Sequence, residues 1–141
     1  MKDPSAGVKR ILVVDDEPAV GQVFFRTLTR EGFEVEIAIN GKAAQDVLQE
    51  KEYDLIIIDI RTPVINGKQL YQFINESYPK LANRTIFTTG DVIGRKTKDF
   101  IEQRGRPFLP KPFTPDELKS IVRETLRQIK NDRQTSHDTD C

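Results

Sequence analysis

Four short polar stretches of the sequence contain side chains that could bind a cation or a phosphate group. Each follows a short stretch that could form a strand, and the four are Asp15-Asp16-Glu17, Asp59, Thr88-Thr89-Gly90 and Lys111-Pro112. Together they offer carboxylates, a hydroxyl and an ammonium group. Carboxylates that converge repel one another unless a cation lies among them, and a hard divalent ion with oxygen ligands is the natural choice. The sequence therefore predicts a Mg²⁺ site wherever the fold brings these stretches together.

The composition argues against several other kinds of site. The chain has 141 residues with one histidine and one cysteine, so neither a closed zinc site nor Cys–His or Ser–His catalysis is expected. Lys plus Arg total 22 and Asp plus Glu total 22, which leaves no net positive charge to hold nucleic acid or an anionic membrane. No apolar run is long enough to span a bilayer. The lone Cys141 can form no internal disulfide and no signal peptide is recognisable, which fits a reducing cytoplasm.

The spacing of apolar residues predicts alternating strands and helices. Strands are expected at 11–14, 35–39, 55–58 and 85–88, with a short fifth strand at 107–109. After each of the first three strands, apolar residues recur every three or four positions, as in a helix with one buried face. A weaker helical pattern follows the fourth strand. The last helix has the clearest start, because a Thr-x-x-Glu capping box with proline at the first helical position precedes its apolar stripe.

This alternation predicts an α/β fold. Strands that are apolar throughout are typical of a parallel sheet with helices on both faces, so we expect a doubly wound sandwich. The folded domain is expected at 9–130, with a disordered N-terminus over 1–8 and a disordered polar tail over 131–141, which has no apolar face. Ligands of such sheets bind beyond the carboxyl ends of the strands, at the point where the strand order reverses. The four polar stretches all lie at such ends.

Each polar stretch also has a purely structural interpretation. The run Asp15-Asp16-Glu17-Pro18 is typical of a helix start, where acids and proline are favoured in the first turn. Thr89 suits a strand, and Lys111 before a proline is commonly only a loop cation. Asp59 is harder to explain in this way, because aspartate is depleted in strands and is costly to bury unpaired. The coincidence of all four signals at strand ends favours a functional site.

The order and spacing of these motifs resemble the receiver domain of two-component response regulators. The matching motifs are Ile-Leu-Val-Val-Asp-Asp-Glu-Pro over 11–18, Asp59 with Pro63 and Gly67 after it, Thr89-Gly90, and Lys111-Pro112-Phe113. Pro63, Asn66 and Gly67 also suit an ordinary turn. The resemblance covers nearly the whole folded unit and implies a flavodoxin-like (βα)5 fold, with a five-stranded parallel sheet of order 2-1-3-4-5. That order places the switch point between the first and third strands, where the aspartates lie.

The resemblance implies a role for each site residue. Asp59 resembles the phosphoacceptor, while Lys111 and Thr89 resemble the lysine and hydroxyl that contact the phosphoryl group. The Mg²⁺ ligands that it implies are Asp15, Asp16, Asp59 and the backbone carbonyl of Arg61. These residue types suit phosphoryl transfer, in which the protein mainly positions groups and neutralises oxygens.

The resemblance also implies a conformational switch. Thr89 and Phe108 fall at the positions of the family's switch hydroxyl and switch aromatic ring, and Phe108 could instead be permanent core. The Lys111–Pro112 bond is expected to be cis, which an X-Pro bond permits cheaply. Output is expected through the face of the fourth helix, fifth strand and fifth helix, toward a partner protein or a second copy of the chain.

The function implied is that of a signalling module rather than an enzyme acting on other substrates. It would receive a phosphoryl group from a phosphohistidine of a histidine kinase or histidine phosphotransfer protein, and would catalyse only its own phosphorylation and dephosphorylation. The stretches 84–92 and 105–113 look most like receivers attached to the C-terminus of hybrid histidine kinases. No segment that could bind DNA follows the last helix, so we expect either a stand-alone receiver or a part of a longer protein.

Three other functions are alternatives to that of a phosphoacceptor. A pseudo-receiver would keep the fold as an interaction module without phosphorylation, and the intact acids, threonine and lysine argue against it. A metal-dependent phosphate-ester hydrolase could use the same carboxylates, but no second acid or general base near Asp59 supports it. Nucleotide binding is weaker still, because no Gly-x-Gly-x-x-Gly or Gly-x₄-Gly-Lys loop follows a strand.

Overall fold

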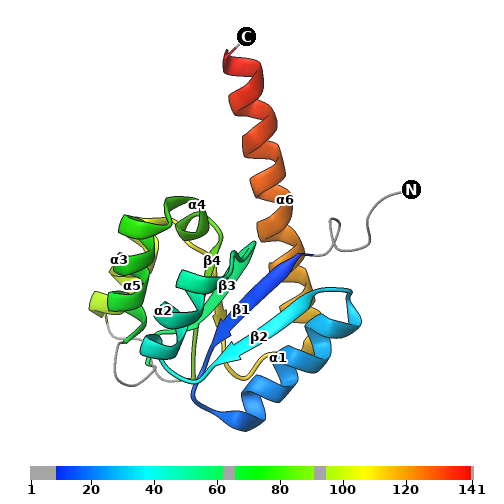
Figure 1. Cartoon of the computed structure of the whole chain (residues 1–141), viewed down its shortest axis with the longest axis vertical. Coiled ribbons are helices and arrows are strands. Elements are labelled where there is room, and N and C mark those ends of the chain that lie inside the picture. The colour runs from blue at the N-terminus through cyan, green and yellow to red at the C-terminus, as the bar shows by residue number, and fades with distance from the viewer. Residues whose placement is uncertain (1–8, 62–65, 91–94, 141) are drawn as a thin grey trace.

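The structure is a computed structural model of the chain, and it describes residues 9–61, 66–90 and 95–140, with side chains up to Gln128. The expected disorder of residues 1–8 and the motif position Pro63 lie outside this part of the chain. Five strands form one sheet: β1 (Arg10–Val14), β2 (Glu34–Ala38), β3 (Leu55–Asp59), β4 (Thr85–Thr89) and β5 (Phe108–Pro110). All neighbouring strands are parallel and the order is β2-β1-β3-β4-β5, which confirms the predicted fold class and strand order (Figure 1).

Within the part of the chain that the structure describes, six helical elements connect and cover the strands. They are α1 (Pro18–Arg30), α2 (Gly41–Glu50), α3 (Gly67–Ser77), α4 (Pro79–Ala82), α5 (Arg95–Arg104) and α6 (Pro115–Asp140). Five were expected, and α4 is a short additional turn with proline at its first position, directly after α3. The fourth and fifth helices of the predicted pattern are therefore α5 and α6. Figure 1 shows α1 and α6 on one side of the sheet and the other helices on the opposite side.

Helix starts follow the local sequence closely. At α6, the Thr114 hydroxyl accepts the N–H of Glu117 and the Glu117 carboxylate accepts the N–H of Thr114, which confirms the predicted capping box. A second capping box, formed by Asn66 and Gln69, starts α3 directly after the loop that follows β3. The start of α3 is thereby fixed beside the carboxyl end of β3.

The C-terminal stretch differs from expectation. Residues from 131 onward were expected to be disordered because they lack an apolar face, yet α6 continues as helix to Asp140. No glycine or proline, the two strongest helix breakers, occurs between Pro115 and Asp140. The earlier part of α6 packs against the sheet, and the residues from 131 onward continue that helix.

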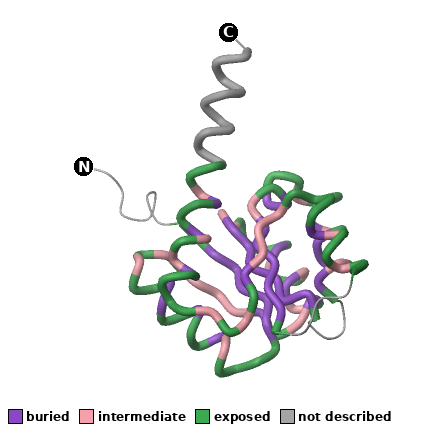
Figure 2. The backbone as a smooth tube through the Cα atoms, turned by 180° about the vertical axis from the view of Figure 1, so that it is seen from behind, coloured by how far each residue is buried: buried purple, intermediate pink, exposed green. Residues whose placement is uncertain are grey.

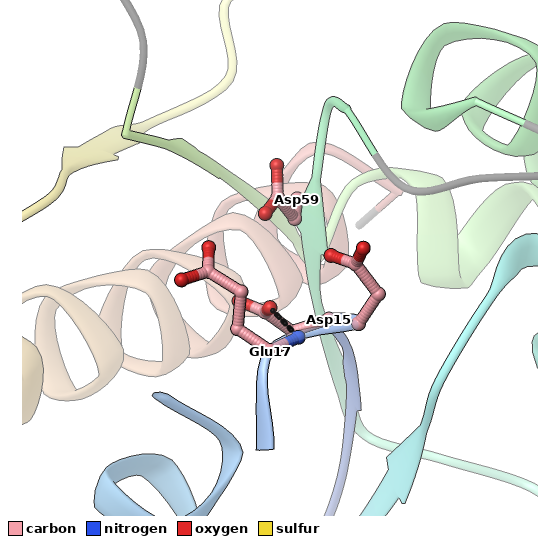
Figure 3. Close-up of side chains that lie close together, drawn as sticks. Asp15, Glu17 and Asp59 are labelled. Atoms are coloured by element: carbon pink, nitrogen blue, oxygen red, sulfur yellow. Dashed lines mark hydrogen bonds between the residues drawn. The ribbon is translucent and has the colours of Figure 1, made fainter. Parts of the chain in front are cut away.

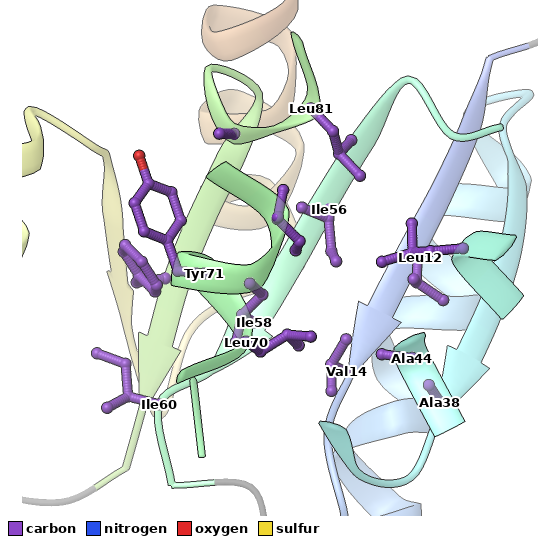
Figure 4. Close-up of a cluster of buried hydrophobic side chains, with 14 of the residues drawn as sticks. Leu12, Val14, Ala38, Ala44, Ile56, Ile58, Ile60, Leu70, Tyr71 and Leu81 are labelled. Atoms are coloured by element: carbon purple, nitrogen blue, oxygen red, sulfur yellow. The ribbon is translucent and has the colours of Figure 1, made fainter. Parts of the chain in front are cut away.

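The core lies on both faces of the sheet. Side chains of β1 and β3 alternate between the faces, and all of the apolar ones are fully buried (Figure 2). Leu12, Val14, Ile56 and Ile58 pack with α2, α3 and α4 in one cluster, which Figure 4 shows in close-up. Their neighbours in sequence pack under α1 and α6 in the second cluster. This double burial is the reason that the polar residues collect at the ends of the strands.

No helix within the described residues combines the length and apolar character needed to cross a membrane.

Candidate functional site

The site is built at the carboxyl ends of β1 and β3, the two central neighbours at which the strand order reverses. Asp15 follows the last residue of β1 and Asp59 is the last residue of β3, and both are almost fully buried, with 2% and 4% of their surface exposed. Asp16 and Glu17 continue from Asp15 and are exposed. One carboxylate oxygen from each of these four acids lies within 4.8 Å of the others (Figure 3). The fold therefore brings the predicted acids together.

Lys111 is the cation at the centre of this acidic cluster. It lies one residue beyond β5, and its Nζ is 2.9 Å from Asp15 Oδ2, 2.9 Å from Asp59 Oδ2 and 2.9 Å from Glu17 Oε1. Burial alone would lower the pKa of this ammonium, but the nearby carboxylates of Asp59, Glu17 and Asp15 raise the pKa well above its usual value. Lys111 is therefore permanently charged at neutral pH.

The carboxylate of Asp15 is oriented by a backbone hydrogen bond, but burial disfavours its charged form. Its Oδ1 accepts the N–H of Glu17 at 2.9 Å. Its Oδ2 is buried and makes an ion pair with Lys111 that lacks hydrogen-bond geometry, so this oxygen has no hydrogen-bond partner among the residues described. Burial raises the pKa of the Asp15 carboxyl above its ordinary value of 3.8, although the Glu17 N–H and Lys111 act in the opposite direction. A buried oxygen with a free lone pair is what a metal ion would use.

Asp59 has both carboxylate oxygens oriented by the chain. Its Oδ1 accepts the N–H of Arg61 at 2.9 Å, and its Oδ2 accepts a hydrogen bond from Lys111. The amide of Arg61 is thus tied to Asp59, while a metal-binding role for the Arg61 carbonyl stays a prediction. The exposed edge of the Asp59 carboxylate faces a pocket that is also lined by Asp16, Arg61, Thr89, Gly90 and Lys111.

The switch residues lie on the neighbouring strands. Thr89 ends β4 with 5% of its surface exposed, and its carbonyl accepts the N–H of Lys111 at 3.1 Å. Phe108 begins β5 opposite Phe87 and is half-buried against the cluster of α2 to α5. The Lys111–Pro112 peptide bond is cis, as predicted. The roles of Thr89 and Phe108 in switching stay predictions.

Two features of the site were not foreseen from the sequence. Glu17 was recognised only as part of the acidic run and as a helix-start residue, yet it bonds Lys111, which is 94 positions away. Gly67 was interpreted as a turn residue, but a Cβ there would lie 2.5 Å from the Ile60 Cα and 3.0 Å from the Asp59 carbonyl oxygen. Gly67 is therefore needed so that α3 can approach the strand that carries Asp59.

The residues present fit Mg²⁺. The acids of the cluster offer only oxygen ligands, two of these acids are buried, and one buried carboxylate oxygen has no hydrogen-bond partner within residues 9–61, 66–90 and 95–128. Such a donor set suits a hard divalent cation that also keeps water ligands. The acids would hold the ion beside the pocket that Asp59 faces.

Comparison with known proteins agrees with this geometry. The family model "Response regulator receiver domain" matches residues 11–123. The transcriptional regulatory protein PcoR of Escherichia coli is 31% identical over 129 residues, covering 91% of this chain and 56% of its own length. The response regulator MprA of Mycolicibacterium vanbaalenii is 29% identical over 123 residues, covering 87% of this chain and 52% of its own. The chain thus spans about half the length of these curated relatives.

Solved structures give the same result. A CheY-like response regulator receiver domain protein from Methanospirillum hungatei superposes with a TM-score of 0.82 at 27% identity, covering 89% of this chain and 99% of that one. The signal receiver domain of a signal transduction histidine kinase from Syntrophus aciditrophicus gives a TM-score of 0.76 at 26% identity, covering 87% of this chain and 93% of that one. The chain belongs to the family of response regulator receiver domains.

Proposed function

We propose that this receiver domain accepts a phosphoryl group on Asp59 from the phosphohistidine of a partner protein. The observation that carries the proposal is the placement of Asp59 at a pocket, with its carboxylate oriented by Arg61 and bonded to Lys111. A carboxylate oxygen attacks phosphorus, the P–N bond to the histidine breaks, and the imidazole leaves with the bonding electron pair. The product on this chain is an acyl phosphate.

The surrounding residues supply what the transferred group needs. A phosphoryl group in transit carries negative charge on its peripheral oxygens, and catalysis consists mainly of positioning and neutralising them. Lys111 offers an ammonium already within 2.9 Å of Asp59. Mg²⁺ would be held by Asp15, Asp16 and Asp59 and would neutralise phosphoryl oxygens when bound. The presence of all these groups disfavours a pseudo-receiver.

The output of phosphorylation would be carried by Thr89 and Phe108. A phosphoryl group on Asp59 adds up to two negative charges and three acceptor oxygens, and a hydroxyl on the neighbouring strand can gain a charge-assisted hydrogen bond by turning toward it. The space that this movement leaves is open to the half-buried ring of Phe108 on β5. We infer that the readout face is built from α5, β5 and α6, toward an output partner or a second copy of the chain.

The partner is inferred from the family. Receiver domains of response regulators interact with histidine kinases or phosphotransfer proteins, and one structural relative is the receiver of a histidine kinase. Attachment of this receiver to a hybrid histidine kinase stays a prediction from the stretches 84–92 and 105–113. The sequence of the gene on either side of this segment would test it directly.

The experiment is intact-mass measurement after incubation with acetyl phosphate and Mg²⁺. We expect the wild type to gain the mass of one phosphoryl group, to gain none in chelator, and Asp59→Asn to gain none. Asp46→Asn is the matched control, because this exposed carboxylate on α2 pairs only with Lys42 among the contacts identified. Labelling of Asp59→Asn at the wild-type level would refute the assignment of the acceptor.

A further inference from the structure

Lys111 has a third carboxylate partner that the phosphoacceptor function does not use. Glu17 Oε1 lies 2.9 Å from Lys111 Nζ, the same distance as Asp15 and Asp59. Its environment differs, because 57% of the Glu17 side chain is exposed while those of Asp15 and Asp59 are buried. Figure 3 shows the Glu17 carboxylate beside those of Asp15 and Asp59. Glu17 therefore holds the ammonium from its solvent side.

The donor capacity of the ammonium makes this contact consequential. An ammonium group has three N–H donors and no acceptor. Three carboxylates surround Nζ: Glu17 and Asp59 accept hydrogen bonds from it, and Asp15 pairs with it by charge. Two of these, Asp15 and Asp59, are also predicted ligands of Mg²⁺. The lysine and the metal ion therefore compete for the same oxygens, whereas Glu17 competes only for the lysine.

We propose that Glu17 is a positioning residue that shares the Lys111 ammonium with Asp15 and Asp59, so that these two aspartates can exchange the ammonium for Mg²⁺ while Glu17 still holds it. This inference rests on the metal site of the proposed function. Without Glu17, the ammonium keeps only the two buried aspartates as carboxylate partners. Mg²⁺ must then displace an ammonium that has no third carboxylate to hold it, so the affinity for Mg²⁺ falls.

A direct effect of Glu17 on the metal is the competing explanation. The carboxylate of Glu17 lies within 4.8 Å of the other three acids, so it could ligate Mg²⁺ or attract it by charge alone. The two explanations differ in their dependence on Lys111. An effect transmitted through Lys111 disappears when the lysine is removed, while a direct effect of the carboxylate does not.

The test is a double-mutant cycle read out as the dissociation constant for Mg²⁺, measured by isothermal titration calorimetry. The variants are Glu17→Gln, Lys111→Met and their combination. We expect Glu17→Gln to weaken Mg²⁺ binding about fivefold when Lys111 is present, a change within the usual range for residues in contact. In the Lys111→Met background, the same substitution should change the dissociation constant by less than about twofold, the range for independent sites.

Two further variants separate charge from geometry. Glu17→Asp keeps the negative charge but shortens the side chain, so it should lose the bond to Lys111 and weaken Mg²⁺ binding as Glu17→Gln does. Glu52→Gln removes an exposed carboxylate outside the site and should leave the affinity unchanged. Thermal melting of each variant verifies that it is folded.

The outcomes are decisive in both directions. Equal weakening by Glu17→Gln with and without Lys111, or wild-type affinity for Glu17→Asp, would show that Glu17 acts on the metal directly. No change in either background would remove any role for Glu17. Failure of the proposed function would be seen separately, as absence of acetyl phosphate labelling in a wild type that binds Mg²⁺ normally.

Discussion

The two ends of the sheet carry similar ion pairs in different surroundings. At the amino end, Arg10 Nε lies 2.9 Å from Glu34 Oε2, with 48% and 63% of the two side chains exposed. At the carboxyl end, Lys111 makes contacts of the same length, but only 9% of its side chain is exposed. Distance alone therefore does not distinguish the structural end from the functional one. Burial does.

The balance of charge also differs between the two ends. At the amino end, the charges of Arg10 and Glu34 are paired one to one, and the backbone N–H of Arg10 bonds the carboxylate of Asp54. At the carboxyl end, one ammonium faces three carboxylates, with that of Asp16 close by. Excess buried negative charge is costly to the fold. The same excess favours a divalent cation there, and such a cation would in turn offset the negative charge of a phosphoryl group.

Substitution of one glycine at each end should have unequal effects on stability. At the carboxyl end, Gly67→Ala places a methyl group 2.5 Å from the Ile60 backbone, so we expect a loss of about 3 kcal/mol in the free energy of unfolding, as for other cases of overpacking. Gly32, in the turn before β2 at the amino end, has a φ of 95° and nothing within 4 Å of an added Cβ. Gly32→Ala should therefore cost only the strain of that φ, about 1 kcal/mol.

Urea unfolding of both glycine variants measures this difference. Because the added methyl at Gly67 also lies 3.0 Å from the Asp59 carbonyl oxygen, Gly67→Ala should slow acetyl phosphate labelling while Gly32→Ala leaves it unchanged. Equal losses of stability at the two positions would mean that α3 can move away from β3 without strain.

Removing the cation at each end tests the role of burial. In chelator, Lys111→Met leaves the buried carboxylates without their counter-charge, and we expect a loss of about 2 kcal/mol, somewhat below the usual cost of breaking a fully buried ion pair because Glu17 is exposed. Arg10→Met should cost less than about 0.5 kcal/mol, as is usual for an exposed pair.

Mg²⁺ should then act on the two cation variants differently. It can replace the missing ammonium among the acids, so saturating Mg²⁺ should stabilise Lys111→Met more than the wild type and should not restore Arg10→Met. Thermal melting with and without Mg²⁺ measures both. A Lys111→Met protein as stable in chelator as the wild type would show that the acids tolerate one another without a cation.

The difference between the two ends also explains how far the sequence could predict the molecule. Continuous apolar runs such as 55–58 specify buried strands, and strand ends are where a parallel sheet collects its polar residues. The positions of Asp15, Asp59 and Lys111 followed from that rule, whereas the roles that the resemblance to receivers implies for them stay predictions. Local periodicity was sufficient because each of these residues is placed by its own strand.

Contacts between distant loops could not be predicted in this way. The bond between Glu17 and Lys111 depends on side-chain direction at the ends of β1 and β5, which periodicity does not specify. The close packing of Gly67 on Ile60 depends on how closely α3 approaches β3. Apolar periodicity also gives no sign that α6 continues from 131 to 140, because a segment that extends an existing helix needs no apolar face of its own.

The smallest expected effects are on the free energy of unfolding when one aspartate at each end of the sheet is replaced by asparagine. The two substitutions should change stability in opposite directions. Burial raises the pKa of Asp15 in the folded protein above its ordinary value of 3.8. Between that value and the raised pKa, the folded protein binds more protons than the unfolded chain, so stability falls as the pH rises through this interval. At neutral pH and without metal, the wild type therefore bears the whole cost of the charged carboxylate. Asp15→Asn should be more stable than the wild type under these conditions, because the amide carries no charge that burial must desolvate.

The gain from Asp15→Asn should vanish as the pH falls below 3.8, where the carboxyl of the wild type is protonated in both states. At the amino end, Asp54→Asn instead weakens the hydrogen bond from the Arg10 N–H and should lower stability at neutral pH by about 0.5 kcal/mol. Urea unfolding in chelator over a series of pH values measures both variants. In saturating Mg²⁺ the wild type should instead be more stable than Asp15→Asn, because only the wild type has the Asp15 carboxylate to bind the ion. If Asp15→Asn is less stable than the wild type at neutral pH in chelator, the carboxyl end is already balanced by Lys111 alone, and its excess negative charge is not what prepares it for a cation.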